Sequence, residues 1–123
     1  MSMHDRKMLK KKEKFINYFC SHFYVIPPDR NIVLWYQDGF IYSQCHKLEE
    51  FDSHKGVLVC LSKAAGISYT DIKSKLAKRG CEDSDSAELF YLYDLAKEKF
   101  FLDEKDIDMI ANSIQKLDIA SYE

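Results

Sequence analysis

Apolar residues recur at helical spacing near the start of the chain. Phe15, Phe19 and Phe23 lie four residues apart, which places them on one face of an α-helix. This pattern predicts a helix over residues 5–22. The helix must end before the Pro-Pro pair at 27–28, because proline lacks the backbone N–H that a helix needs and restricts the residue before it.

Two runs rich in β-branched and aromatic residues follow within residues 31–46, on either side of the sequence QDG. Residues of this kind favour strands, and a short turn that contains glycine joins two antiparallel strands. The sequence therefore predicts a β-hairpin, with Gly39 at the position that needs a positive φ.

The run VLVCL at residues 57–61 is apolar throughout, so periodicity cannot separate helix from strand. In one interpretation, residues 56–61 belong to a buried helix that Gly66 ends. In the other, they form a third strand and extend the hairpin into a three-stranded antiparallel sheet. The sequence leaves both alternatives open.

Three helices are predicted in the rest of the chain. The first lies between Ser68, which can cap it together with Asp71, and Gly80, which can end it. The second covers residues 86–101 and the third residues 103–117, each with an apolar stripe at helical spacing. Asp103 is the expected N-cap of the third helix.

The expected fold is a single α+β domain over residues 1–123, with an N-terminal helix, a β-hairpin and a C-terminal group of three to four helices. Residues 1–12 are a candidate flexible basic arm. No apolar segment of the kind found in secretory signals follows this arm, and the longest apolar run is far shorter than a membrane span. We therefore expect a cytoplasmic protein with no membrane association and four reduced cysteines.

Charge is distributed in blocks along the chain. Residues 1–14 carry six basic and two acidic side chains, and residues 55–80 carry six basic and one acidic. Residues 81–123 carry four basic and twelve acidic side chains. Two basic segments and an acidic C-terminal third are the regions where a charged partner is expected.

Four side chains, Cys20, His22, Cys45 and His46, are types that bind zinc. Their spacing argues against a site, because residues two apart on a helix, or adjacent on a strand, point in different directions. A nucleophilic pair of Cys45 with His22 or His54 lacks any signature of an activated thiol. Since no catalytic or phosphate-binding motif is present either, we expect a non-enzymatic protein without metal or cofactor.

The segment LSKAAGISYTDI at residues 61–72 resembles the pattern LxxxAGISxxxI of many helix-turn-helix units. The matching positions are Leu61, Ala65, Gly66, Ile67, Ser68 and Ile72. In such a unit the glycine takes the tight turn and the serine caps the second helix, which lies in a DNA groove. The resemblance implies a DNA-binding regulator that uses residues 57–80.

The second helix of this unit also supplies positive charge for a phosphate backbone. Its candidate DNA-binding residues are Tyr69, Thr70, Lys73, Lys75, Lys78 and Arg79.

The stretch CEDSDSAELFYLYD at residues 81–94 combines acidic side chains with aromatic and leucine side chains. This mixture suits a surface that docks on a basic protein, as nuclease inhibitors and immunity proteins do. Helical spacing turns Tyr93 toward the core, which makes Tyr91 the better anchor. The candidate partner-binding residues are Glu82, Asp83, Asp85, Glu88, Tyr91 and Asp94.

These patterns favour a cytoplasmic binding protein that sequesters or neutralises a basic protein partner, such as a toxin or nuclease domain. The acidic C-terminal third is the expected contact. The alternative is the helix-turn-helix DNA-binding regulator.

Overall fold

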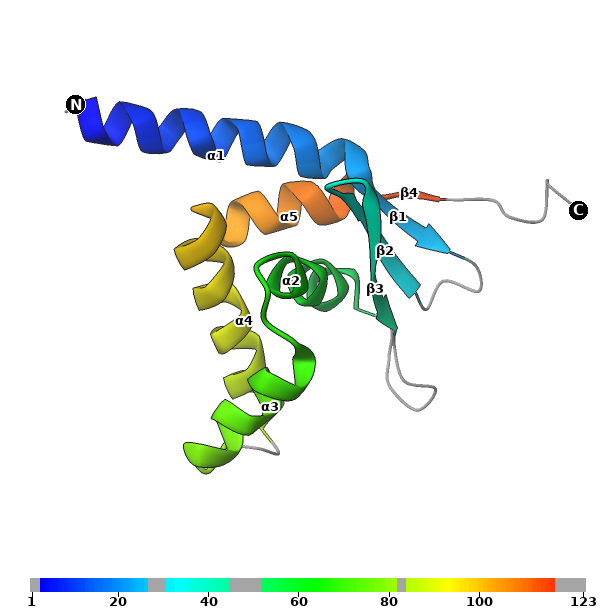
Figure 1. The fold of residues 1–123 in the computed structure, drawn as a ribbon, viewed down its shortest axis with the longest axis vertical. Coiled ribbons are helices and arrows are strands. Elements are labelled where there is room, and N and C mark those ends of the chain that lie inside the picture. The colour runs from blue at the N-terminus through cyan, green and yellow to red at the C-terminus, as the bar shows by residue number, and fades with distance from the viewer. Residues whose placement is uncertain (1–2, 27–30, 45–51, 82–83, 117–123) are drawn as a thin grey trace, which may run out of the picture.

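The computed structural model describes residues 3–26, 31–44, 52–81 and 84–116 (Figure 1). The predicted α+β class is confirmed, with an N-terminal helix, a sheet and then a group of helices. The elements are α1 (Met3–His22), β1 (Phe23–Ile26), β2 (Asn31–Tyr36), β3 (Gly39–Gln44), α2 (Ser53–Ala64), α3 (Tyr69–Lys78), α4 (Asp85–Phe100), α5 (Glu104–Asn112) and β4 (Gln115–Lys116).

The long helix α1 confirms the predicted N-terminal helix, and residues 3–12 form its first half. Its apolar face packs on the body of the protein. Phe15 stacks on Phe19 with ring centroids 5.9 Å apart, and Phe19 meets Phe100 of α4 edge-on at 5.4 Å. These aromatic contacts join the first helix to the C-terminal group of helices.

The chain passes directly from α1 into β1, a strand that the sequence did not predict. β1 has four residues, too few for an alternating pattern to stand out, and Phe23 continues the helical spacing of the preceding phenylalanines. β1 pairs antiparallel with β2, with Phe23 opposite Leu34.

The predicted hairpin is confirmed as β2 and β3, but its turn differs from the expectation. Gln37 and Asp38 have φ values of 50° and 63°, and Gly39 pairs with Tyr36 as the first residue of β3. A two-residue turn with two positive φ values matches the right-handed twist of the strands. The prediction that Gly39 needs a positive φ was therefore wrong.

The sheet has the strand order β3-β2-β1-β4, and the described helices lie on one side of it (Figure 1). The run VLVCL is not one of its strands. It lies inside α2, so the helical alternative is correct, and β1 takes the place of the third strand.

α2 is the central helix of the fold, packed between the sheet and α4 (Figure 1). Asp52 caps its N-terminus by accepting a 2.9 Å hydrogen bond from the backbone N–H of His54. Every residue from Gly56 to Ser62 is buried. A helix that is enclosed on all sides needs no polar face, which explains why its sequence showed no periodicity.

Two of the C-terminal helices, α3 and α5, begin at predicted caps. Ser68 and Asp71 form a capping box at α3, and Asp103 and Asp106 form a second one at α5. Gly80 ends α3 with a φ of +71°. Each box satisfies backbone N–H groups that a helix start leaves unpaired.

α5 ends at Asn112, five residues before the predicted end at Leu117, which lies outside the described residues. After this helix the chain extends into β4, which pairs parallel with β1 through Tyr24 and Gln115. This strand pairing replaces the last turn of the predicted helix.

An ion pair at the other end of α5 holds α1 in place. Lys12 Nζ lies 2.8 Å from Asp106 Oδ2 and 3.3 Å from Asp103 Oδ2.

Within the described ranges, no helix has the length and apolar character needed to cross a membrane.

Candidate functional site

The predicted acidic surface is centred on α4, and the structure divides its residues. Asp85 and Asp94 are exposed, Tyr91 is half-buried and Glu88 is buried. Glu82 and Asp83 lie outside the described residues. Glu88, which was predicted to offer a charge to a partner, is therefore enclosed by the fold.

Glu88 is enclosed because α3 packs against the first half of α4. Its Oε1 atom accepts a 2.7 Å hydrogen bond from Tyr69 Oη, and its Oε2 atom lies 2.9 Å from Lys73 Nζ. Lys55 Nζ of α2 lies 3.3 Å from Oε1. One carboxylate thus joins three helices.

The charge state of Glu88 follows from these contacts. Burial alone would raise its pKa, but the hydrogen bonds from Tyr69 and Lys73, with the charge of Lys55, outweigh burial and lower the pKa below the usual value. The same hydrogen bond raises the pKa of Lys73. Glu88 is therefore ionised, and its negative charge is balanced inside the fold by Lys55 and Lys73.

Phe90 occupies the middle of the outward face of α4, and it was not among the predicted partner-binding residues. Its side chain is 67% exposed, more than any other large apolar side chain in the described ranges. Asp94 follows one helical turn later on the same face, whereas Leu92 and Ala96 are buried on the opposite side. Helical spacing could have revealed Phe90, because it lies about 160° around the helix from Leu92.

The two tyrosines that the sequence distinguished, Tyr91 and Tyr93, are both half-buried and both pack against the core. The Arg79 guanidinium lies 5.4 Å from the centroid of the Tyr91 ring. Burial raises the pKa of Tyr93, with a further contribution from the nearby carboxylate of Glu104. Tyr91 therefore already contacts a cation of α3, which limits its use as an anchor.

The helix-turn-helix resemblance agrees with the local backbone. α2 ends at Ala64, Gly66 has a φ of +85°, and the Ile67 N–H donates a 2.9 Å hydrogen bond to the Ser62 carbonyl. Ser68 then caps α3. The residues between the two helices thus have the turn geometry that the pattern implies.

The candidate DNA-binding residues of α3 fall into two groups. Tyr69 and Lys73 point to Glu88 of α4 and are engaged there. The others, Thr70, Lys75, Lys78 and Arg79, are exposed. Only this second group has no contact with Glu88.

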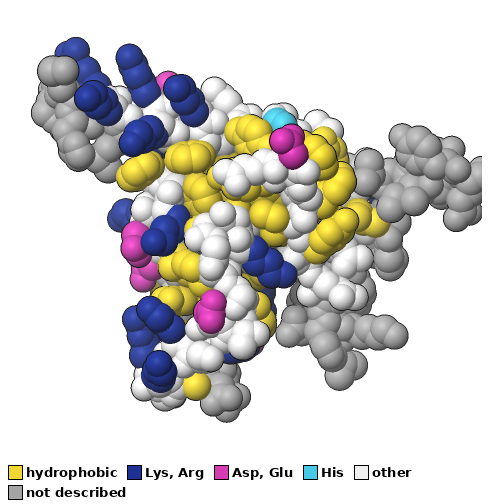
Figure 2. All heavy atoms as spheres, viewed as in Figure 1, with side chains coloured by type: hydrophobic (Ala, Val, Ile, Leu, Met, Phe, Trp, Pro, Cys, Tyr) yellow, Lys and Arg dark blue, Asp and Glu magenta, His cyan; other side chains and the backbone are white. Residues whose placement is uncertain are grey.

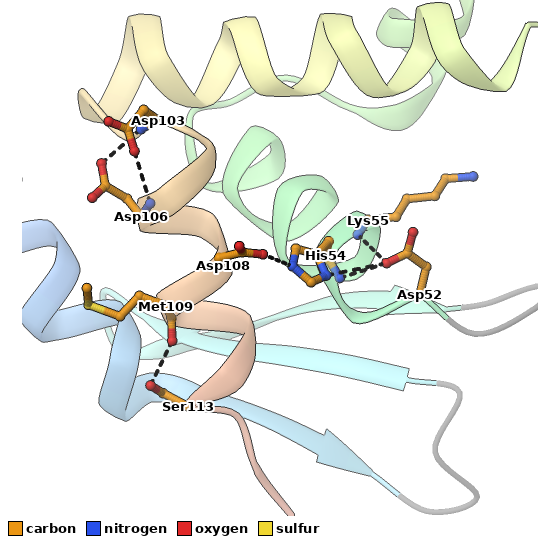
Figure 3. A network of polar contacts seen from close by, with 8 residues as sticks. All are labelled: Asp52, His54, Lys55, Asp103, Asp106, Asp108, Met109 and Ser113. Carbon is orange, nitrogen blue, oxygen red and sulfur yellow. Dashed lines mark hydrogen bonds and ion pairs between the residues drawn. The ribbon is translucent and has the colours of Figure 1, made fainter.

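A third cluster connects α2 with α5 (Figure 3). The His54 ring lies between two carboxylates, with Nε2 in contact with Asp108 Oδ1 and Nδ1 3.8 Å from Asp52 Oδ1. Asp52 also caps α2, so the cluster fixes the start of the central helix against α5. The contacts of this cluster therefore indicate that it stabilises the packing of α2 on α5.

The candidate zinc ligands are divided by the structure. Cys20 and His22 lie at the end of α1, whereas Cys45 and His46 lie outside the described residues. The His22 ring stacks on Tyr18 with centroids 3.8 Å apart. In the part of the chain that the structure describes, no group of three or more His, Cys, Asp or Glu side chains could hold a metal ion.

Comparison of the chain with protein-family models, with curated proteins and with solved structures gives no match.

Proposed function

We propose that this chain is a non-enzymatic, cytoplasmic protein-binding domain whose partner contacts the outward face of α4. The exposure of Phe90 carries the proposal, because this face presents a 67% exposed aromatic ring to water. Covering such a ring removes apolar surface from water, and aromatic side chains are prominent among the residues that dominate binding energy.

The charge around Phe90 favours a basic partner, such as a toxin or nuclease domain. Asp94 lies one turn from Phe90, Asp85 begins the helix, and Glu82 and Asp83 precede it in the sequence. Such acids accelerate association with a basic surface, whereas the covered aromatic ring slows dissociation. The proposed role is to sequester or neutralise the partner.

Site-specific photo-cross-linking tests this proposal. A photoreactive phenylalanine analogue at position 90 should give a cross-linked protein adduct in cells, and the same analogue at Met109, which is 52% exposed on α5, should not. The adduct identifies the partner. Equal adducts at the two positions would show that α4 has no preference for a partner.

Binding kinetics with the identified partner separate the role of the acids in association from the role of Phe90 in dissociation. Phe90→Ser should speed dissociation at least tenfold, and Asp94→Lys should slow association at low salt with little effect on dissociation. If neither variant changes a rate, the face is not the binding site.

The helix-turn-helix geometry at Gly66 and Ser68 favours a second candidate, a DNA-binding regulator. In that case the exposed Lys75 and Lys78 would contact phosphates. A Lys75→Gln/Lys78→Gln variant should then lose DNA affinity, and log affinity should fall less steeply with log salt, by about two units of slope. An unchanged slope rejects this candidate.

A further inference from the structure

Five cations of α1 form one continuous surface, which we call the basic stripe. At about 100° per residue, they fall within an arc of about 140° over about 12 Å of helix. Figure 2 shows Lys and Arg side chains gathered over the N-terminal half of α1. The members of the basic stripe are Arg6, Lys7, Lys10, Lys11 and Lys14.

The basic stripe is exposed, and one acidic side chain, Glu13, lies beside it. All five side chains are exposed, and none forms an ion pair with any residue of the described ranges. Lys12 differs, because it lies on the other side of the helix and binds Asp103 and Asp106. One cation of this segment, Lys12, thus stabilises the fold, and the other five face water.

The opposite side of α1 fixes the direction in which the basic stripe points. Lys12 binds α5, and Phe15 meets Phe100 of α4 edge-on with ring centroids 5.2 Å apart. Figure 1 shows the first turns of α1 extending past α4. A partner can therefore approach the basic stripe without rearrangement of the fold.

The basic stripe also destabilises the helix that carries it. Arg6 and Lys10, Lys7 and Lys11, and Lys10 and Lys14 are like charges four residues apart, a spacing that destabilises a helix. Cations in the first turns also oppose the helix dipole, which favours negative charge at the N-terminus. A bound polyanion relieves both effects.

We infer that the N-terminal half of α1 binds the phosphate backbone of double-stranded nucleic acid through the basic stripe. A B-DNA duplex carries about seven phosphates along 12 Å of its axis, a charge density that five cations in that length can match. Contacts of this kind are independent of base sequence.

An anionic membrane surface fits the segment less well. A helix that lies in a membrane interface needs a free apolar face. The apolar face of α1 is packed on the body through Phe15 and Phe19, and Leu9 is its exposed member, at 43%. The basic stripe therefore offers charge with little apolar surface to insert.

A second group of cations lies on the same side of the molecule. Figure 2 shows Lys and Arg side chains over α3 as well as over α1, with α4 between the two helices. The cations of α3 therefore serve as the internal comparison of the test, in which their removal should cost less affinity than removal of two cations from the basic stripe.

Fluorescence anisotropy with a 20-base-pair DNA duplex of mixed sequence tests the inference, using the full chain over a range of salt. Three double variants each remove two exposed cations, from the basic stripe (Lys10→Gln/Lys14→Gln), from α3 (Lys75→Gln/Lys78→Gln), and from α4 and α5 (Lys97→Gln/Lys105→Gln). Circular dichroism confirms that each variant is folded. Glutamine is a good helix former, so α1 should remain helical.

The basic-stripe variant should bind on the order of 10–100-fold more weakly at 0.1 M salt, and its log affinity should fall less steeply with log salt, by about two units of slope. The α4–α5 variant should bind like the unaltered protein. Absence of binding by the unaltered protein, an unchanged slope in the basic-stripe variant, or an equal loss in the α4–α5 variant overturns the inference.

A parallel measurement with vesicles of anionic lipid separates the two polyanions. Tighter binding to the vesicles than to the duplex, lost in the basic-stripe variant, overturns the inference in favour of a membrane surface. Weaker vesicle binding supports it. Because the Phe90 variants leave the basic stripe intact, they should bind the duplex normally even if α4 has no protein partner.

Discussion

Tyr69 Oη donates a 2.7 Å hydrogen bond to Glu88 Oε1, across the contact between α3 and α4. Each residue was a surface candidate in the sequence, Tyr69 for DNA and Glu88 for a protein partner. In the structure the two satisfy each other, and Lys73 joins them. This contact removes Tyr69 and Glu88 from the two candidate surfaces. The residues that remain are Lys75 and Lys78 on α3 and Phe90 and Asp94 on α4.

Glu88→Gln should lower the free energy of unfolding by about 2–4 kcal/mol. The substitution removes the negative charge from a side chain that is 3% exposed and faces two lysines. The neutral amide loses the charge-assisted character of the hydrogen bonds that the carboxylate accepts in this buried position. Urea denaturation measures the loss. The matched control is Glu98→Gln at a 68% exposed side chain, which should cost less than about 0.5 kcal/mol. Equal losses would show that Glu88 is not a structural charge.

Acid should destabilise the protein in a defined pH range. Hydrogen bonds to Glu88 and to Asp103 hold their pKa values below the usual 4.5 and 3.8. A carboxylate with a lowered folded pKa contributes stability above its unfolded pKa, and this is lost as the pH falls through the folded value. The unfolding free energy should therefore decline below about pH 4.5. Urea midpoints measured from pH 6 to pH 3 should fall less steeply in Glu88→Gln, and an unchanged decline would contradict this assignment.

Gly56→Ala should destabilise the protein by about 1–3 kcal/mol, although alanine is the better helix former. A Cβ atom at this position would lie 2.5 Å from Ile32 Cγ1 and 3.1 Å from Ile32 Cβ. Ile32 is 1% exposed in β2 and cannot move aside. The double variant Gly56→Ala/Ile32→Ala should therefore lose less stability than the sum of the two single variants. Strict additivity in thermal or urea unfolding would show that the two residues do not collide.

The sequence predicted the elements whose signals are local. The caps at Ser68 and Asp103 and the amphipathic stripes lie within a few residues of the helices they define. β1 and β4 were missed because four-residue and two-residue strands contain too little alternation to detect. The run VLVCL was ambiguous for a different reason, since α2 is buried on all sides.

The candidate sites depended on contacts that are distant in sequence. Glu88 meets Tyr69 and Lys73 across 19 and 15 residues, so no local pattern distinguished it from exposed acids such as Asp94. The exposure of Phe90, by contrast, could have been predicted from helical spacing alone. The segment was instead judged by its acids and tyrosines, and Phe90 was assigned neither to the core nor to the candidate partner-binding residues.

The β2–β3 turn gives different predictions for two adjacent residues. Asp38 has a φ of 63°, which costs energy for a residue with a Cβ, so Asp38→Gly should stabilise the protein by about 0.5–1 kcal/mol. Gly39 is extended, and a Cβ there would meet its nearest neighbour, the Tyr36 carbonyl oxygen, at 3.9 Å. Gly39→Ala should therefore be nearly neutral. Thermal unfolding compares the two, and a large loss in Gly39→Ala would restore the positive φ that the sequence suggested.

The three described cysteines, Cys20, Cys60 and Cys81, are free thiols with different surroundings. Cys60 is fully buried in α2, and burial raises the pKa of its thiol to about 12. The thiolate is the reactive form, so at pH 8 Cys60 should react with iodoacetamide only when the protein unfolds.

Cys20 and Cys81 are half-buried and should react in the folded state. Peptide mass spectrometry after timed alkylation measures each site separately. In urea above the unfolding midpoint, Cys60 should become as reactive as the other two, which controls for the intrinsic reactivity of its peptide. Alkylation of Cys60 in the native protein at the rate of Cys81 would mean that α2 opens without global unfolding. The central helix would then not be the rigid element on which α3 and α4 are positioned.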